Sequence, residues 1–302
     1  MEIYPKIIMI LQKNIKEKIN KMKFLDIRTD FAFKKVFGSE DSKVRLISFL
    51  NAIIQFENNA KIQDLQIVDP YNIPQLKGMK DTFVDVKAIL DNGLKVIIEM
   101  QVLNHPGFEK RVLYNAAKNY STQLLEGEQY HLLNPIIALT IVDFIMFEDS
   151  DKVISNFKLT EKEKFINYSD DLEMIFIELP KFTKKLEELA DIKDQWIYFI
   201  KNAASLAFIP ENMSSPVNSA FEVSNTAGLT PEELEIQRKK REFIYIQKTS
   251  LELAQQQGEA IGQARGEARE KIKMAKAMLL QGISLDIVAV VSGLSQDVLS
   301  QL

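Results

Sequence analysis

Hydrophobic positions near the start of the chain recur at the spacing of an amphipathic helix. Between Thr29 and Phe56, apolar residues return every three or four positions, which places them on one face of an α-helix. Thr29 and Asp30 stand where helix N-caps are found, and Gly38 indicates a turn within the segment. The pattern therefore predicts helical structure over residues 29–56, followed by a short strand at 65–68.

Two β-rich runs form the clearest pattern in the chain. Residues 82–90 and 94–102 are separated by Asp91, Asn92 and Gly93, and a glycine at a turn position that needs a positive φ favours a hairpin. If all three residues form the loop, counting back along both strands places Asp85 opposite Glu99. A two-residue Asn-Gly turn would shift the register and put these acids on different faces.

The middle of the chain alternates helical and strand patterns. A helix is predicted at about residues 106–125, and helices follow at about 182–189 and 195–208. The run 136–142 is almost wholly apolar, which is typical of a strand buried on both faces, and 172–178 predicts another strand. This order favours an α/β fold with a central mixed sheet flanked by helices.

The composition changes in the last third of the chain. Residues 211–231 are rich in Ser, Asn and Pro and are predicted to be a linker, and 232–302 are predicted to be an all-helical extension. The residues 277–302 predict a pair of short helices, which would form a small interaction module resembling a helix-turn-helix arrangement.

Three glycines four residues apart lie in the long helical segment: Gly258, Gly262 and Gly266. Two interpretations remain open. The glycines either weaken an exposed helix by roughly 1 kcal/mol each relative to alanine, or they line a close contact between two helices. We favour the second interpretation, which predicts a homo-oligomer formed through the C-terminal helices.

Composition removes several classes of site. The chain of 302 residues has no cysteine, which excludes disulfides, thiolate metal sites and cysteine nucleophiles, and it has only two histidines for a zinc site. The net charge of −4 argues against a uniformly basic surface but allows local basic faces. Apolar runs are far shorter than the roughly 20 residues of a membrane-spanning helix. We expect a cytoplasmic protein without a membrane partner, in which residues 1–22 form an N-terminal extension.

The hairpin carries the candidate chemistry. Opposed residues on antiparallel strands have Cβ atoms about 5 Å apart, so Asp85 and Glu99 would repel each other unless a cation or a proton lay between them. Carboxylate oxygens at this spacing suit Mg²⁺ or Mn²⁺. Lys87 and Gln101 would project to the same face. A solvated hairpin face is the ordinary alternative, but the apolar residues around both acids weigh against it.

The combined motifs resemble a known family. The segments are KFLDIRTDFAFKKVFG at 23–38, KDTFVDVKA, VIIEMQV, KRVLYNAAKNY and the later ELPKF. Together they resemble the Rpn family of recombination-promoting nucleases, which are also described as PD-(D/E)XK family transposases. The resemblance covers roughly residues 24–208. It implies a restriction-endonuclease-like (PD-(D/E)XK) core over residues 23–210.

The resemblance also implies a function and the residues that carry it. It implies a Mg²⁺-dependent DNA endonuclease, with Mn²⁺ as a possible substitute, linked to DNA recombination or mobile elements. By position, Asp85 and Glu99 would hold the metal. Gln101 stands where the wider superfamily has lysine, so Lys87 or, as a second candidate, Lys80 would supply the missing cation.

Four further residues have both a functional and an ordinary interpretation. Asp30 would be a third metal ligand or, as we favour, a helix N-cap, and Lys34 would contact phosphate or belong to a solvated helix face. Arg111 and Tyr114, three residues apart on one helix, would touch DNA or pack against the sheet. Because Gln101 replaces the lysine, the alternative function is a catalytically silent DNA-binding or protein-interaction module that retains the nuclease fold.

Overall fold

The computed structural model describes residues 24–56, 60–72 and 82–302. The predicted N-terminal extension and Lys80 lie outside the described residues. The chain divides into two compact units, the first ending at Ile244 and the second comprising Tyr245–Leu302.

The helical prediction for the first segment is confirmed, with a break where the glycine indicates it. Helix α2 (Asp30–Phe37) ends at Gly38, whose backbone N–H donates to the Lys34 carbonyl at 2.7 Å. A 3₁₀ turn (Glu40–Ser42) and helix α3 (Lys43–Ile53) follow. Thr29 caps α2, because its hydroxyl accepts from the Ala32 N–H. Asp30 is the first residue inside the helix, so the prediction that it is the N-cap is wrong.

A six-stranded mixed sheet forms the centre of the first unit, as the sequence predicts. Its strand order is β1-β4-β5-β6-β8-β7. Strands β5, β6 and β8 run parallel, and the other neighbours are antiparallel. The bounds are β1 (Leu65–Val68), β4 (Val86–Leu90), β5 (Lys95–Gln101), β6 (Ile136–Val142), β7 (Ile154–Thr160) and β8 (Asn167–Glu178). Strands β2 (Tyr71–Asn72) and β3 (Thr82–Phe83) pair separately.

The β4–β5 hairpin has the register that a three-residue loop requires. Val86 lies opposite Ile98, and the Leu90 N–H donates to the Leu94 carbonyl at 2.8 Å. Gly93 has a φ of +83°, a left-handed conformation that glycine adopts without a steric penalty. The predicted loop and register are therefore confirmed.

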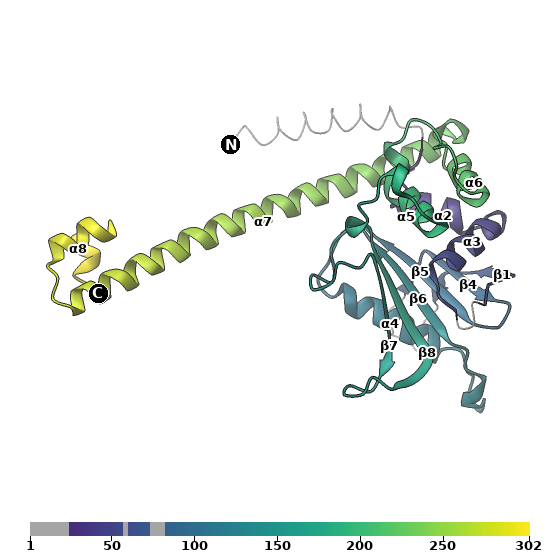
Figure 1. Ribbon diagram of the computed structural model, residues 1–302, viewed down its shortest axis with the longest axis horizontal. Helices are drawn as coiled ribbons and strands as arrows, with labels where there is room; N and C mark the ends of the chain where they lie inside the picture. Colours follow the sequence, from purple (N-terminus) through teal and green to yellow (C-terminus); the bar gives the residue numbers. More distant parts are fainter. Residues whose placement is uncertain (1–23, 57–59, 73–81) are drawn as a thin grey trace. The chain divides into compact units, whose positions relative to one another are not determined.

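The side chains of β5 alternate between the two faces of the sheet, which is drawn with its flanking helices in Figure 1. Val96, Ile98 and Met100 enter the main core, which is covered by α2, α3, α5 (Ile192–Asn202) and α6 (Ser215–Val223). Ile97 packs on the opposite face against helix α4 (Phe108–Ser121). Because successive strand residues point to opposite faces, Glu99 and Gln101 belong to the α4 face.

Three elements differ from the sequence prediction. The predicted linker 211–231 contains helix α6, whose buried Val217, Ala220 and Phe221 belong to the main core. The predicted helix at 182–189 is replaced by 3₁₀ turns at Leu179–Lys181 and Leu186–Glu188. Strand β7 was not predicted: it lies at the sheet edge, and most of its residues are exposed, so it lacks the apolar alternation of a half-buried strand.

Helix α7 (Pro231–Leu280) begins in the first unit and continues into the second. Helices α8 (Leu285–Ser292) and α9 (Gln296–Leu299) follow it, with Ser295 capping α9, as the sequence predicts. Ala275, Val288 and Leu299 form the small core of the second unit. In the part of the chain that the structure describes, no helix is both long and apolar enough to span a membrane.

Candidate active site between strand β5 and helix α4

Asp85 is fixed against strand β5 on both sides of Glu99. It lies at a bend just before β4, and its backbone N–H donates to the Ile98 carbonyl at 2.9 Å. Its carboxylate oxygen Oδ2 accepts from the Met100 N–H at 2.7 Å. Because Ile98 and Met100 flank Glu99, these two bonds hold the two acids next to each other, as the register predicts.

Both carboxylates are largely removed from water. The side chains of Asp85 and Glu99 are 13% and 14% exposed, respectively. Burial raises the pKa of Asp85, and the Met100 N–H and the charge of Lys34 offset only part of this rise. Burial also raises the pKa of Glu99, which the charge of Arg111 lowers in part and the charge of Asp85 raises again. The pair carries an electrostatic cost that an added cation would relieve.

Arg111 brings a positive charge to the Glu99-Met100-Gln101 triplet from helix α4. Its Nη2 forms an ion pair with Glu99 Oε1 and also donates to Gln101 Oε1 at 2.7 Å. The guanidinium lies over the Phe108 ring, 5.2 Å from its centre. Gln101 in turn donates to the Leu103 carbonyl at 2.6 Å. Gln101 therefore acts here as a fixed acceptor that orients Arg111.

Asn115 is a site residue that the sequence analysis missed. It lies one helical turn after Arg111 and is 2% exposed, and its Nδ2 donates to Glu99 Oε2 at 3.4 Å. Its Oδ1 is buried and has no hydrogen-bond partner among the described residues. The i, i+4 spacing from Arg111 on the face turned toward the sheet was the only signal in the sequence.

Helix α2 adds one cation and one anion near Asp85. Lys34 Nζ lies 3.8 Å from Asp85 Oδ1. The negative charge of Asp30 contributes to the raised pKa of Asp85, after burial. Asp30 is itself paired with Lys240 of α7, with 3.0 Å between Nζ and Oδ2. The structure thus places Asp30 in the electrostatic field of the site.

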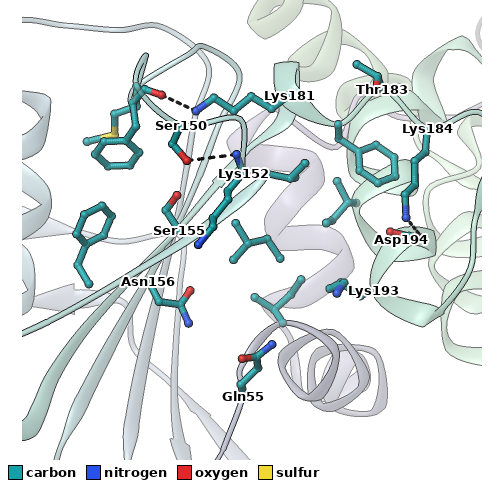
Figure 2. A pocket seen from close by; sticks show the side chains of 18 of the residues that line it. Gln55, Ser150, Lys152, Ser155, Asn156, Lys181, Thr183, Lys184, Lys193 and Asp194 are labelled. Atoms are coloured by element: carbon teal, nitrogen blue, oxygen red, sulfur yellow. Dashed lines mark hydrogen bonds and ion pairs between the residues drawn. The ribbon is translucent and has the colours of Figure 1, made fainter.

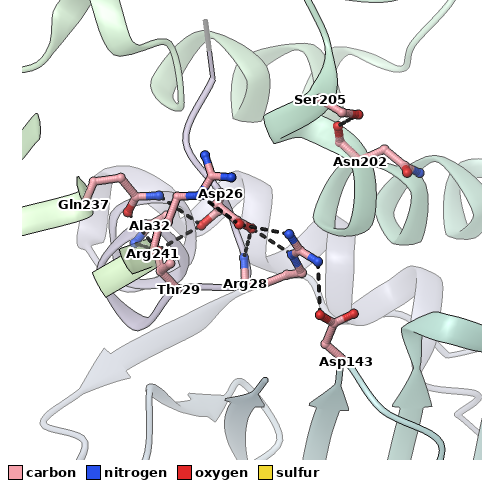
Figure 3. Close-up of polar contacts among 9 residues, drawn as sticks. All are labelled: Asp26, Arg28, Thr29, Ala32, Asp143, Asn202, Ser205, Gln237 and Arg241. Carbon is pink, nitrogen blue, oxygen red and sulfur yellow. Dashed lines mark hydrogen bonds and ion pairs between the residues drawn. The ribbon is translucent and has the colours of Figure 1, made fainter. Parts of the chain in front are cut away.

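A buried network supports this end of α2 (Figure 3). Arg28 donates to both carboxylate oxygens of Asp26, at 2.8 and 2.9 Å, and to Asp143 at 3.0 Å. Arg241 of α7 lies 3.4 Å from Asp26, and Gln237 Oε1 accepts from the Thr29 hydroxyl at 2.8 Å. The Asp143 N–H donates to the Gln101 carbonyl at 3.0 Å. The network therefore connects α7 and the start of α2 to the end of β5.

The other predicted residues are placed differently. Lys87 lies on the same face of the sheet as Glu99, but its charged neighbours are Lys95 and Asp69. Burial and the charge of Lys95 lower the pKa of Lys87, and the charge of Asp69 raises it in part. Tyr114 is 39% exposed on α4. Lys80 lies outside the described residues. The cations that the structure brings to the two acids are Arg111 and Lys34.

A separate cleft of about 1170 Å³ lies at the other edge of the sheet, beside β7 (Figure 2). It is lined by several lysines, but Lys184 donates to Asp194 at 2.6 Å, and Lys181 donates to Glu178 and to the Phe147 carbonyl, both at 2.7 Å. Its positive charge is therefore largely compensated. It contains none of the predicted site residues.

The oxygen donors around Glu99 fit a divalent cation. In residues 24–56, 60–72 and 82–302, no three His, Cys, Asp or Glu side chains gather as a metal-binding group. Mg²⁺ is commonly held by one or two carboxylates together with water and substrate phosphate, and Asp85 and Glu99 supply two. The buried, unpartnered Oδ1 of Asn115 beside Glu99 supplies a further oxygen with unmet bonding capacity.

Comparison with known proteins gives the family. The family model described as PD-(D/E)XK nuclease family transposase matches residues 27–254, which include every described residue of the site. No curated protein and no solved structure matched the chain. The match covers most of the chain and agrees with the mixed sheet and its flanking helices. The chain belongs to the PD-(D/E)XK nuclease family transposases.

Proposed function

We propose that the protein is a metal-dependent DNA endonuclease that hydrolyses phosphodiester bonds at Asp85 and Glu99. One observation carries the proposal: Asp85, just before β4, and Glu99, on β5, are largely removed from water and lie next to each other, and Arg111 of α4 bonds Gln101, which stands where lysine is expected. Membership of a nuclease family supports the same chemistry.

The proposed cofactor is Mg²⁺, with Mn²⁺ as a substitute, held by Asp85 and Glu99. When bound, such a cation polarises a phosphoryl oxygen and lowers the pKa of a coordinated water. Two carboxylates whose charge is poorly solvated favour a dication strongly, because each loses part of its hydration in the fold.

Arg111 supplies the positive charge that Gln101 lacks. An arginine can donate two hydrogen bonds to a phosphate and stays charged at any physiological pH, so Arg111 would stabilise the negative charge that develops on the phosphorus oxygens. Gln101 orients the guanidinium through its Oε1. Lys34, whose side chain is 46% exposed beside Asp85, would attract the DNA backbone.

The family description connects the activity to transposition, and we propose a cytoplasmic role in DNA recombination or in mobile elements. We also propose self-association through α7. A Cβ at Gly258, Gly262 or Gly266 would meet nothing within 4 Å, so the described chain leaves this glycine face open.

Cleavage of a supercoiled plasmid tests the nuclease proposal. We expect nicking in Mg²⁺ or Mn²⁺ that EDTA stops and that Glu99→Gln and Asp85→Asn each reduce by more than about 100-fold. Glu173→Gln is the matched control, because burial also raises the pKa of Glu173, on β8 away from the acids. Equal cleavage by the wild type and Glu99→Gln would contradict the proposal. DNA binding without cleavage would favour the catalytically silent module.

A further inference from the structure

An aromatic pair, of which Phe83 is exposed and Tyr71 is half-buried, lies in the chain segments that lead into the acidic site. Phe83 stacks on Tyr71 across the β2–β3 pair, with ring centres 4.6 Å apart and ring planes inclined by 22°. The Phe83 residue is 64% exposed, although phenylalanine is among the most hydrophobic residue types. The pair thus offers a flat apolar surface to solvent.

The position of this surface is fixed by its neighbours. Val84 is 3% exposed and packs in the α4-face core, and Asp85 is bonded to β5. Phe83 is only two residues before Asp85, so their Cα atoms are at most about 7 Å apart. The backbone that carries the Phe83 ring therefore lies within roughly one nucleotide of the backbone of Asp85.

Basic side chains lie at the two acids that follow the aromatic pair. Lys34 Nζ lies 3.8 Å from Asp85 Oδ1, and Arg111 forms an ion pair with Glu99. Clustered positive charge attracts the phosphate backbone, and exposed aromatic rings beside such charge accept nucleobases by stacking. A base inside a duplex is already stacked on both sides, so only an unpaired base has a free face for an aromatic side chain.

We propose that Phe83, supported by Tyr71, stacks an unpaired nucleobase next to the scissile phosphate. The preferred substrate class is then DNA with a single-stranded nucleotide at the cleavage position, such as a fork, a flap or a single strand. This inference rests on the proposed nuclease function for the identity of the neighbouring site, but the stacking itself is measured without cleavage.

Binding in EDTA tests the stacking directly. The probes are a single strand, a forked duplex and a blunt duplex, the first two carrying 2-aminopurine at an unpaired position. We expect Phe83→Ala and Phe83→Leu to weaken binding of the single strand and the fork by about tenfold and to abolish the 2-aminopurine quenching, with the blunt duplex unaffected. Phe83→Trp should retain the wild-type binding and the 2-aminopurine quenching. Phe83→Leu serves as a second variant because it keeps apolar bulk against Tyr71 if alanine perturbs the fold.

Phe208→Ala is the matched control, because Phe208 is 70% exposed in the first unit and lies in the segment between α5 and α6, not in β2–β5. Unchanged single-strand binding by Phe83→Ala and Phe83→Leu, or equal losses on all three DNAs, would overturn the stacking proposal. Failure of the nuclease proposal gives a different result: no wild-type cleavage of any DNA, with the Phe83-dependent binding in EDTA intact.

Discussion

Arg111 pairs with Glu99 across the space between α4 and β5 and bonds Gln101 through the same nitrogen. The lysine position of the nuclease motif is thus filled in a different way: the strand contributes an amide, and the neighbouring helix contributes the charge. Because Arg111 is held by Glu99, Gln101 and the Phe108 ring, its guanidinium is oriented before substrate arrives, which is the condition under which a charge stabilises a transition state well.

Removing Arg111 should impair cleavage more than DNA binding. We expect Arg111→Ala to reduce single-turnover cleavage by about 100- to 1000-fold, with a smaller loss for Arg111→Lys, which keeps the charge but not the paired donors. Lys110→Ala, the adjacent exposed cation of α4, is the control for general electrostatic attraction. Equal effects of Arg111→Ala and Lys110→Ala on cleavage would show that Arg111 contributes only long-range charge.

Asp85→Asn should stabilise the protein in EDTA while abolishing cleavage. The pKa of Asp85 is raised, first by burial, so ionised Asp85 destabilises the fold above the unfolded-state pKa, and a neutral amide removes this cost while an oxygen remains for the Met100 N–H. Differential scanning fluorimetry at neutral pH should show a higher Tm for the variant in EDTA. Mg²⁺ should raise the Tm of the wild type alone; equal stabilisation of both proteins would place the metal elsewhere.

Asp26 should govern part of the stability at acid pH. Burial alone would raise the pKa of Asp26, but the hydrogen bonds and charge of Arg28 and the charge of Arg241 outweigh it, and the pKa is lowered. Ionised Asp26 therefore stabilises the fold fully at pH values above its unfolded-state pKa of 3.8. This stabilisation is lost as the pH falls through the lower pKa that Asp26 has in the folded state. We expect Asp26→Asn to cost about 3 kcal/mol at neutral pH.

Urea unfolding across pH measures this effect. The difference between the wild type and Asp26→Asn should shrink as the pH falls below 3.8, because protonated Asp26 no longer pairs with Arg28. Asp91→Asn, in the exposed hairpin loop, should not change the free energy of unfolding. A constant difference between wild type and Asp26→Asn at all pH values would mean that the charge of Asp26 contributes nothing.

The local sequence pattern predicted the hairpin and the position of Asp85 opposite Glu99, because strand residues alternate strictly between two faces and Gly93 fixes the loop. The role of Arg111 at the triplet was not predictable in the same way. Its reach to Glu99 depends on how α4 packs over β5, through Ala116 against Ile97, and periodicity shows which helix face is apolar but not which strand that face covers.

Tertiary burial also explains the misjudged segments. The start of α6 has the Ser and Pro composition of a loop, yet Phe221 is fully buried beside Phe199 and Phe24. Composition cannot show that these rings meet across nearly 200 residues of chain. Asn115 was missed for a related reason: a single asparagine on a helix is ordinary until the carboxylate opposite it is known.

The glycine face of α7 gives a prediction for self-association. Gly258, Gly262 and Gly266 weaken an isolated helix by roughly 1 kcal/mol each relative to alanine, a cost that close approach of a second helix would offset. We expect the wild type to sediment as an oligomer at micromolar concentration, and a triple Gly→Leu variant at these positions to sediment as a monomer, because the new side chains separate the helices.

The same helix supplies a matched control. Ala260, Ala264 and Ala268 have the same four-residue spacing, and an offset of two residues, at 3.6 residues per turn, places them on the opposite side of the helix. A triple Ala→Leu variant adds comparable apolar bulk there and should remain oligomeric. If both triple variants behave as the wild type does, or if the wild type is a monomer, the glycines do not form a helix contact. If only the alanine variant dissociates, the contact lies on the other face of α7.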